Sequence, residues 1–408
     1  MNRGTMKKGI QSGWRACCVT VTLCVATAAV LLPTSSSAGA SGVKGSTYEL
    51  YFTDTGVTPA GKYLPAISDA INAAGGINGH PLKVVDCDDQ GNPNQATQCA
   101  QKATSDPNVL GIVGNTSTCG SELLPILARA HMASIGDQYF CAEDYKSAQV
   151  FPFSAGSLDP AAGAAIAVTE LHMKNMVIAT ADVPAGREYP PLVQSVVAPV
   201  GGHITGSVYV PFSAADMAPY ASQIAGDSGF FVDGNTTAVG IRLGKALVEQ
   251  GFKEPVEYNG TTWDAATIKA NFGNPTNAYI ETPYNVSSAG YNMFVADVNK
   301  YAPGAKYYST DLSTVWLAAM IVQRWAKNVP HPTASALLKY LSTAASINTW
   351  GMTIPLSYTK ASKVLGGVAA RAVNPCTALY HYESGKLVEV GKFVDMLNTG
   401  ANRVRCVG

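Results

Sequence analysis

The chain has 408 residues, with 28 basic and 28 acidic side chains. A chain of this length is normally too long to fold around a single hydrophobic core and is typical of two domains. The balanced charge, without a basic cluster, argues against nucleic acid or an anionic membrane surface as a partner.

The first forty residues have the three-part pattern of a secretory signal peptide. An apolar run of 17 residues spans 16–32, and a small-residue tail ends near Ala38 or Ala40. The basic residues that precede the run are Arg3, Lys7, Lys8 and Arg15. The run is marginal for a spanning helix, so an uncleaved anchor is the alternative. Cleavage would leave 24 basic and 28 acidic residues, a net charge of −4. We expect a soluble mature protein that is secreted, periplasmic or loosely held at the cell surface.

Six cysteines remain beyond this leader, and an even number in an oxidising compartment predicts three disulfides. They are Cys87, Cys99, Cys119, Cys141, Cys376 and Cys406. Local spacing favours Cys87–Cys99, while Cys119 and Cys141 follow successive predicted strands and would meet at one sheet edge. The remaining two would then pair, although six cysteines allow 15 connectivities. A zinc site is disfavoured because there is no CxxC pair, and we expect no metal and no cofactor.

Strand and helix signals alternate through the first part of the mature chain. Strand patterns cover 48–53, 81–88, 109–114 and 133–136, and helical patterns cover 61–76, 92–104 and 121–130. The first helix stops at Gly75 and Gly76, and Asn92 or Asn94 caps the second. This repetition predicts a parallel sheet with helices on both faces.

A second block of the same kind follows. Strands are expected at 175–181, 203–210, 228–234, 254–258 and 277–282, and helices near 188–199 and at 217–225, 235–251, 288–301 and 311–328. The segments 349–359 and 376–394 predict short strands, the latter with a hairpin at Ser384 and Gly385. No long linker interrupts the chain, so the two halves should be closely coupled.

The stretch GIVGNTSTCGSE, residues 111–122, places a polar turn between a strand and a helix that begins near Gly120. Ligands bind beyond the carboxyl ends of parallel strands, and free N–H groups of a helix start suit an anion such as a carboxylate. Thr116, Ser117 and Thr118 add hydroxyls there, although a helix cap would explain one of them.

A nucleophilic role for this turn is disfavoured. The turn lacks the G-x-S-x-G pattern, and His131 would lie at the far end of the following helix. Cys119 in an oxidising compartment is expected in a disulfide rather than as a thiolate.

The block NAAGGINGHPL at 72–82, followed by a strand and DDQ at 88–90, resembles the type I periplasmic binding proteins. These include the leucine/isoleucine/valine and amide receptors of ABC importers. Further segments that agree in order are 111–128, 210–224 with Asp216, 247–256 and 348–359. The likeness covers essentially all of residues 46–395.

The resemblance implies an α/β fold of two Rossmann-like lobes, with parallel-type sheets flanked by helices, that close on a ligand held between them. Three crossovers would join the lobes, near 154–158, 283–288 and 350–354. Lobe 1 would comprise 46–155 and 288–350, and lobe 2 would comprise 156–287 and 351–408.

The resemblance also implies ligand-binding residues. Ser117 and Thr118 would hold an amino acid's carboxylate, and Gln138 and Tyr139 would contribute after the fourth strand. From the second lobe the family's positions match Asp233, Asn235, Thr236 and Trp263. Ala185, Thr236 and Gly260 stand where amino-acid receptors commonly have an aromatic and an acid, so Asp182 and Asp233 are the carboxylates available for an ammonium group.

We therefore expect a non-enzymatic extracytoplasmic protein, monomeric when mature, that captures a small polar metabolite such as an amino acid, amide or related carboxylate. The implied partner is a membrane ABC permease, contacted transiently. The alternatives are a ligand sensor of the same fold without transport and, disfavoured, a secreted hydrolase using Ser117.

Overall fold

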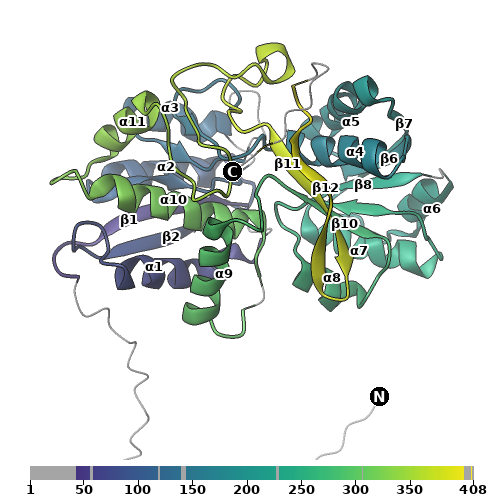
Figure 1. The fold of residues 1–408 in the computed structure, drawn as a ribbon, viewed down its shortest axis with the longest axis horizontal. Helices are drawn as coiled ribbons and strands as arrows, with labels where there is room; N and C mark the ends of the chain where they lie inside the picture. The colour runs from purple at the N-terminus through teal and green to yellow at the C-terminus, as the bar shows by residue number, and fades with distance from the viewer. Residues whose placement is uncertain are drawn as a thin grey trace, which may run out of the picture. The chain divides into compact units, whose positions relative to one another are not determined.

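The computed structural model describes residues 43–398, apart from 56–57, 118–119, 139–143, 227–228 and 306, together with Cys406. These residues belong to one unit, residues 40–408, and form two sheets with helices on both faces (Figure 1). The predicted α/β class with parallel-dominated sheets is confirmed. The predicted signal peptide lies outside the described residues.

The first sheet has five parallel strands in the order β2-β1-β3-β4-β5. They are β1 (Tyr48–Asp54), β2 (Leu82–Asp88), β3 (Val109–Val113), β4 (Ser134–Ile135) and β5 (Val150–Phe151). One hydrophobic cluster joins β1 to α1 (Leu64–Ala73), α9 (Ala289–Tyr301), α10 (Thr310–Ala326) and α11 (Ala334–Thr343). A second cluster joins β3 to α2 (Pro93–Ser105) and α3 (Gly120–Arg129), and the 3-10 turn η1 (Ala60–Tyr63) precedes α1.

The second sheet has seven strands in the order β12-β11-β10-β9-β8-β6-β7. The parallel strands are β6 (Asn175–Ala181), β7 (His203–Val210), β8 (Phe230–Gly234), β9 (Val256–Tyr258) and β10 (Ala278–Thr282). The antiparallel hairpin of β11 (Cys376–Glu383) and β12 (Lys386–Asp395) extends it, turning at Ser384 and Gly385 as predicted. The covering helices are α4 (Leu158–Glu170) and α5 (Pro184–Val197), and α6 (Ala218–Gly226), α7 (Thr237–Glu249) and α8 (Ala265–Phe272).

Local features agree with the sequence at several points and differ at others. The Asn92 side chain accepts the backbone N–H of Asn94 at 2.9 Å, so Asn92 is the cap of α2. Helices α4, α8 and α11 were not predicted. The strands predicted over 349–359 are absent from that described segment, where residue 356 makes only an isolated bridge to residue 347.

The segments that run between the two sheets are hydrogen-bonded to one another. The buried Asn374 side chain donates to the carbonyl of Phe153 at 2.9 Å and to that of Pro283 at 3.3 Å. The Asn285 N–H donates to the Met352 carbonyl at 2.8 Å. Asn374 therefore holds two of the connections together, and the Asn285 bond joins the second of them to the third.

Residues 351–408 were assigned to lobe 2 by resemblance, but two residues of this range contact the first sheet. The Tyr358 ring packs edge-on against Phe151 at 5.1 Å, and Arg371 Nε donates to the Val150 carbonyl at 2.7 Å. The lobe boundaries remain a prediction.

Two disulfides are present, Cys87–Cys99 and Cys376–Cys406, as predicted. The third expected pair, Cys119 and Cys141, lies outside the described residues. Within the part of the chain that is described, no helix is long and apolar enough to cross a bilayer.

Candidate functional site

A network of buried polar side chains lies where the strands of the first sheet end, with Asn115 at its centre. Asn115 Oδ1 accepts the Thr53 hydroxyl at 2.6 Å and the Ser117 N–H at 3.1 Å. Its Nδ2 donates to Asp137 Oδ2 at 3.1 Å, and that oxygen also accepts the Ser134 hydroxyl at 2.8 Å. All five residues are buried, so one amide fixes the spacing of the turns after β3 and β4.

Ser117, in the predicted hydroxyl run, donates its hydroxyl to the carboxylate of Asp89, just after β2. Asp89 also accepts the Gly91 N–H at 2.7 Å; burial raises its pKa, and these two hydrogen bonds oppose the rise. His131, the histidine nearest in sequence, is exposed beyond the end of α3. Ser117 is thus paired with an acid rather than with a histidine, which is not the arrangement of an activated serine nucleophile.

Two other predicted residues of the first sheet lie beside this network. Thr116 is 4% exposed, its N–H donates to the Thr53 carbonyl at 2.9 Å, and its hydroxyl has no hydrogen-bond partner in the part of the chain that is described. The Gln138 N–H donates to the Asn115 carbonyl at 2.9 Å, and its side chain accepts the Ser154 hydroxyl at 3.5 Å. The structure therefore brings Thr116, Ser117 and Gln138 together. Thr118 and Tyr139 lie outside the described residues.

Three residues of the network, Asp89, Asn115 and Asp137, were not among the predicted ligand-binding residues. Each lies within two residues of the end of a strand, so the rule that selected 116–118 could have selected them too. Burial, with Asp144 nearby, raises the pKa of Asp137 well above its ordinary value, and none of the described residues forms a hydrogen bond with its Oδ1.

In the second sheet, Asp233, Asn235 and Thr236 lie together at the end of β8. Asp233 Oδ1 accepts the Asn235 N–H at 3.1 Å and its Nδ2 at 2.9 Å, while the other carboxyl oxygen faces Gly240 of α7. Burial raises the pKa of Asp233 to about 7. Within the described ranges Asn235 Oδ1 has no hydrogen-bond partner, and Thr236 is the N-cap of α7 without a side-chain hydrogen bond. Asp233 thus orders this turn.

Two further predicted residues lie apart from this group. Trp263 is 1% exposed in the core of the second sheet, 4.4 Å from the ring of Tyr258 and 5.9 Å from that of Phe272. Asp182 forms a partly exposed ion pair with Arg187 at 2.5 Å. Trp263 therefore packs as a core residue, and Asp182 is neutralised by a neighbour on α5.

The loop after β9 contacts the segment that leads into α10 on the first sheet. The backbone carbonyls of Gly260 and Thr261 accept the N–H groups of Thr310 and Asp311 at 3.2 and 3.0 Å. Asp264 Oδ2 accepts the Tyr308 N–H at 2.7 Å. Three hydrogen bonds thus join the carboxyl end of the second sheet to the start of helix α10 and the segment just before it.

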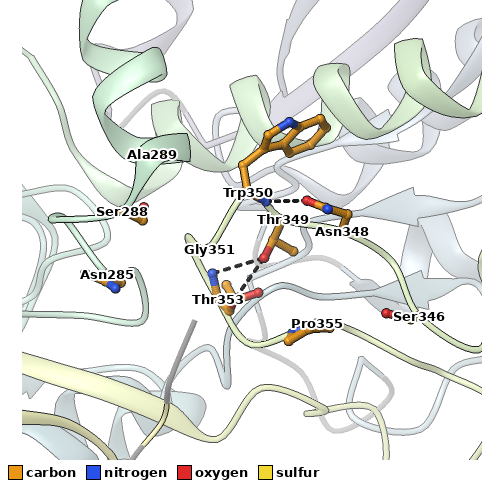
Figure 2. A pocket seen from close by; sticks show the side chains of 10 residues that line it. All are labelled: Asn285, Ser288, Ala289, Ser346, Asn348, Thr349, Trp350, Gly351, Thr353 and Pro355. Atoms are coloured by element: carbon orange, nitrogen blue, oxygen red, sulfur yellow. Dashed lines mark hydrogen bonds between the residues drawn. The ribbon is translucent and has the colours of Figure 1, made fainter.

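A cavity of about 550 Å³ lies beside the connecting segments (Figure 2). The residues that line it are Asn285, Ser288, Ala289, Ser346, Asn348, Thr349, Trp350, Gly351, Thr353 and Pro355. None of the predicted ligand-binding residues is among them. Much of its polar lining is already bonded internally: Asn348 Oδ1 accepts the Trp350 N–H at 2.7 Å, and the Thr349 hydroxyl donates to the Thr353 carbonyl at 2.9 Å. No group of three or more His, Cys, Asp or Glu side chains in the described ranges could hold a metal ion.

Comparison with known proteins gives the family. A family model described as periplasmic binding protein matches residues 66–366. No curated protein matches the chain in sequence. Its fold is similar to that of an extracellular ligand-binding receptor from Verminephrobacter eiseniae, at 20% identity and a TM-score of 0.70, covering 84% of this chain and 99% of that one.

Two similar structures were solved with solutes bound. One is a branched-chain amino acid transporter substrate binding protein from Streptococcus pneumoniae in complex with isoleucine, at 16% identity and a TM-score of 0.64, covering 85% of this chain and 99% of that one. The other is a solute binding protein of an ABC transporter from R. palustris in complex with 4-hydroxybenzoate. It has 18% identity and a TM-score of 0.67, and the match covers 88% of this chain and 97% of that one. The chain belongs to the periplasmic binding protein family, whose members bind solutes and are not enzymes.

Proposed function

We propose that the protein is an extracytoplasmic solute-binding protein that captures a small polar metabolite and delivers it to a membrane ABC permease. The observation that carries the proposal is the buried network at the ends of β2, β3 and β4, where the enclosed Thr116 hydroxyl lacks a hydrogen-bond partner among the described residues. Preorganised polar groups at the carboxyl edge of a parallel sheet bind a solute without chemistry. Similar proteins solved with isoleucine and with 4-hydroxybenzoate support a small organic ligand.

The proposed contacts come from both sheets. On the first sheet they are Thr116, Ser117, Thr118, Gln138 and Tyr139, with Asn115 and Asp89 as positioning residues. On the second they are Asn235 and Thr236, with Asp182, Asp233 and Trp263 in supporting positions. Export would depend on the predicted signal peptide, and the two disulfides support an oxidising compartment.

The test is a thermal-shift screen of amino acids, amides and aromatic carboxylates against the purified protein. One class of solute should raise the melting temperature, and Thr116→Ala should reduce that rise. Ser121→Ala is the matched control, because Ser121 is exposed on α3 and its hydroxyl donates to the neighbouring Glu122 carboxylate. A broad screen in which no solute stabilises the protein would contradict the proposal.

A sensor of the same fold is the second candidate. Co-purification of a permease with the ligand-loaded protein would favour transport, and recovery of a signalling receptor alone would favour sensing.

A further inference from the structure

Two glutamates lie beside each other on the face of the second sheet that α4 covers. Glu257 of β9 is paired with Tyr279 of β10, and Glu281 comes two residues after Tyr279, so both glutamates point to the same face. Both lie against Gly163 of α4, where a Cβ atom would be 2.7 Å from Glu281 Cβ and would clash with a carboxyl oxygen of Glu257. Glu257 is 0% exposed and Glu281 is 1% exposed, so the two acids are neighbours in a region closed to water.

The two carboxyl groups differ in their hydrogen bonds. Both oxygens of Glu281 lie 3.0 Å from the Gly260 nitrogen, whose N–H they accept. Neither oxygen of Glu257 has a hydrogen-bond partner among the described residues. A buried carboxylate without a donor is costly, and the neutral acid avoids that cost. The geometry therefore favours a charged Glu281 beside a protonated Glu257.

The ionisable groups that act on this pair are acids and tyrosines. Burial raises the pKa of Glu257 well above its ordinary value, and Glu281 adds to the rise. Burial also raises the pKa of Glu281; backbone N–H groups oppose the rise, and Asp159 of α4 adds to it. Tyr189 of α5 interacts electrostatically with both glutamates and with Tyr145. Each of these groups would add a like charge on ionisation, which favours the neutral form of Glu257.

The basic residues of the surrounding elements pair with other acids. The sequences of α4, β8, β9 and β10 contain no lysine, arginine or histidine. Helix α5 has Arg187, which pairs with Asp182 at 2.5 Å, and β11 has His381, whose Nδ1 lies 3.1 Å from Glu383. A second ionisation in the glutamate pair would therefore place two like charges together without a cation from these elements.

Gly260 connects the glutamate pair to the first sheet. Its N–H donates to Glu281, and its carbonyl accepts the N–H of Thr310, the first residue of α10, at 3.2 Å. The Thr282 hydroxyl, one residue after Glu281, lies 3.2 Å from the Thr310 hydroxyl. A Cβ atom on Gly260 would clash with the Glu281 carbonyl oxygen, so this loop lies directly against β10. Glu281 thus fixes the group that caps α10 from the other sheet.

We propose that Glu281 positions loop 259–264 against helix α10 only while Glu257 holds a proton, and that loss of this proton releases the loop and a captured solute. The proposal rests on the proposed function and assigns its regulation. When Glu257 ionises, repulsion between the two carboxylates displaces Glu281 from Gly260. Because burial raises the pKa of Glu257, the stabilisation is complete below the pKa of the unfolded chain and is lost as pH rises through the raised value.

Amide hydrogen exchange, followed by NMR, measures the contact without a solute. In the wild type the Gly260 and Thr310 N–H groups should lose about tenfold or more of their protection between pH 6 and pH 9, after correction for intrinsic exchange. Glu257→Met replaces the acid with an apolar side chain of similar size, and protection should change less than about twofold over this range. Other buried acids titrate too, so the difference between these two proteins carries the result.

Equal loss of protection in wild type and in Glu257→Met would overturn the role of Glu257. Glu257→Gln, which is also uncharged, replaces the methionine variant if that one does not fold.

Variants of Glu281 test its positioning role. Glu281→Gln keeps an oxygen for the Gly260 N–H without a charge, so protection should remain and should depend less on pH. Glu281→Leu removes the acceptor, and the Thr310 N–H should lose about tenfold or more of its protection at pH 6. Full protection of Thr310 in folded Glu281→Leu would overturn the positioning role.

Solute binding is measured by calorimetry at pH 6 and pH 9. The probes are isoleucine, 4-hydroxybenzoate and whichever amino acid, amide or aromatic carboxylate raises the melting temperature most in the thermal-shift screen. The affinity of a solute that binds should fall about tenfold or more at pH 9 in the wild type, and by less in Glu257→Met.

Thr310→Pro removes the donated N–H at a helix position that accepts proline, and should weaken binding at both pH values. The matched control is Ala289→Pro, since Ala289 is the exposed first residue of α9. The preceding residues have nearly the same backbone angles, φ −67° and ψ 166° at Ser309 and φ −70° and ψ 159° at Ser288.

A solute affinity that stays constant while the amides lose protection would overturn the release of solute and leave the proposed function standing. If no solute binds at either pH, the proposed function fails and the release of solute fails with it. Amide exchange in the same variants would still decide whether the two glutamates control the contact with α10.

Discussion

Asp159 lies in the first turn of α4 with its carboxyl group fully buried, and burial raises its pKa from 3.8 to about 7. Hydrogen bonds, including those from the Ala155 N–H at 3.3 Å and the Thr377 hydroxyl at 3.4 Å, oppose this rise only in part. Between these two pKa values the folded protein holds a proton that the unfolded chain has lost. The stabilisation is therefore complete below the unfolded pKa and is lost as pH rises through about 7.

We predict that the free energy of unfolding falls between pH 5 and pH 8, and that the fall is smaller in Asp159→Asn. The amide keeps an oxygen that can accept the same hydrogen bonds but has no charge to desolvate. A pKa difference of this size corresponds to a few kcal/mol, about 4 at most. Urea unfolding across this range measures it, with exposed Asp69→Asn as the control; parallel curves for wild type and Asp159→Asn would contradict the prediction.

At the residue scale, the position of a side chain at the end of a strand could be predicted from the sequence, whereas its contacts could not. Thr116 and Ser117 lie in the turn where they were expected, because the strand-to-helix transition is visible in the order of apolar and polar residues. The sequence could not show that the Ser117 hydroxyl is paired with Asp89, since that contact joins turns 28 residues apart. Nor could it show that Trp263 stacks in the core, because its neighbours come from β9 and α8.

At the scale of elements, helix α4 was not predicted from the sequence, and its burial explains why. Every residue from Leu158 to Val168 is buried, so the helix has no polar face. A helix enclosed on all sides lacks the apolar stripe with a period of 3.6 residues on which its recognition depends. Helix α7 was predicted because it is amphipathic and its apolar residues recur at helical spacing.

Gly163 is the position on α4 where a side chain has no room. A Cβ atom there would lie 2.7 Å from Glu281 Cβ and would clash with a carboxyl oxygen of the buried Glu257. We predict that Gly163→Ala lowers the free energy of unfolding by about 1–3 kcal/mol, although alanine is the better helix former. The control is Gly226→Ala, at an exposed helix position with no heavy atom within 4 Å, which should be neutral or stabilising. If Gly163→Ala and Gly226→Ala unfold at the same temperature, the prediction of a steric clash at Gly163 is wrong.

The two disulfides close loops of different length, with sequence separations of 12 and 30. Loop-closure entropy predicts stabilisation of about 3 kcal/mol for the shorter loop and about 3.5 kcal/mol for the longer. We therefore expect the double variant Cys376→Ser/Cys406→Ser to melt at a lower temperature than Cys87→Ser/Cys99→Ser, and both below wild type. Adding a reductant to wild type should remove most of the difference, and no loss in either double variant would contradict the prediction.

On the scale of the whole molecule, Asp264 connects the second sheet to the first. Its carboxylate caps α8 by accepting the Thr267 N–H at 2.8 Å and accepts the Tyr308 N–H from the segment before α10. Asp264→Ala should cost about 2–4 kcal/mol, since it removes a cap and leaves a part-buried N–H unpaired. Asp216→Ala is the matched control, because Asp216 accepts the Ala218 N–H at 2.9 Å at an exposed helix start and should cost about 1 kcal/mol.

Calorimetry adds a second measurement on the same variant. With that connection weakened, the two sheets should unfold less cooperatively, and the Asp264→Ala transition should broaden or split. A sharp transition at the wild-type temperature would show that the connection contributes nothing.

Helix α10 also has a consequence for the order in which the protein is made. Val315 and Leu317 share a hydrophobic cluster with Leu50 and Phe52, so the strand that emerges first from the ribosome is buried by a helix synthesised more than 250 residues later. A nascent chain that ends before residue 310 lacks the α10 side chains of this cluster, and contacts of such long sequence separation slow folding. We therefore expect a chain truncated before residue 310 to aggregate more readily than the full chain.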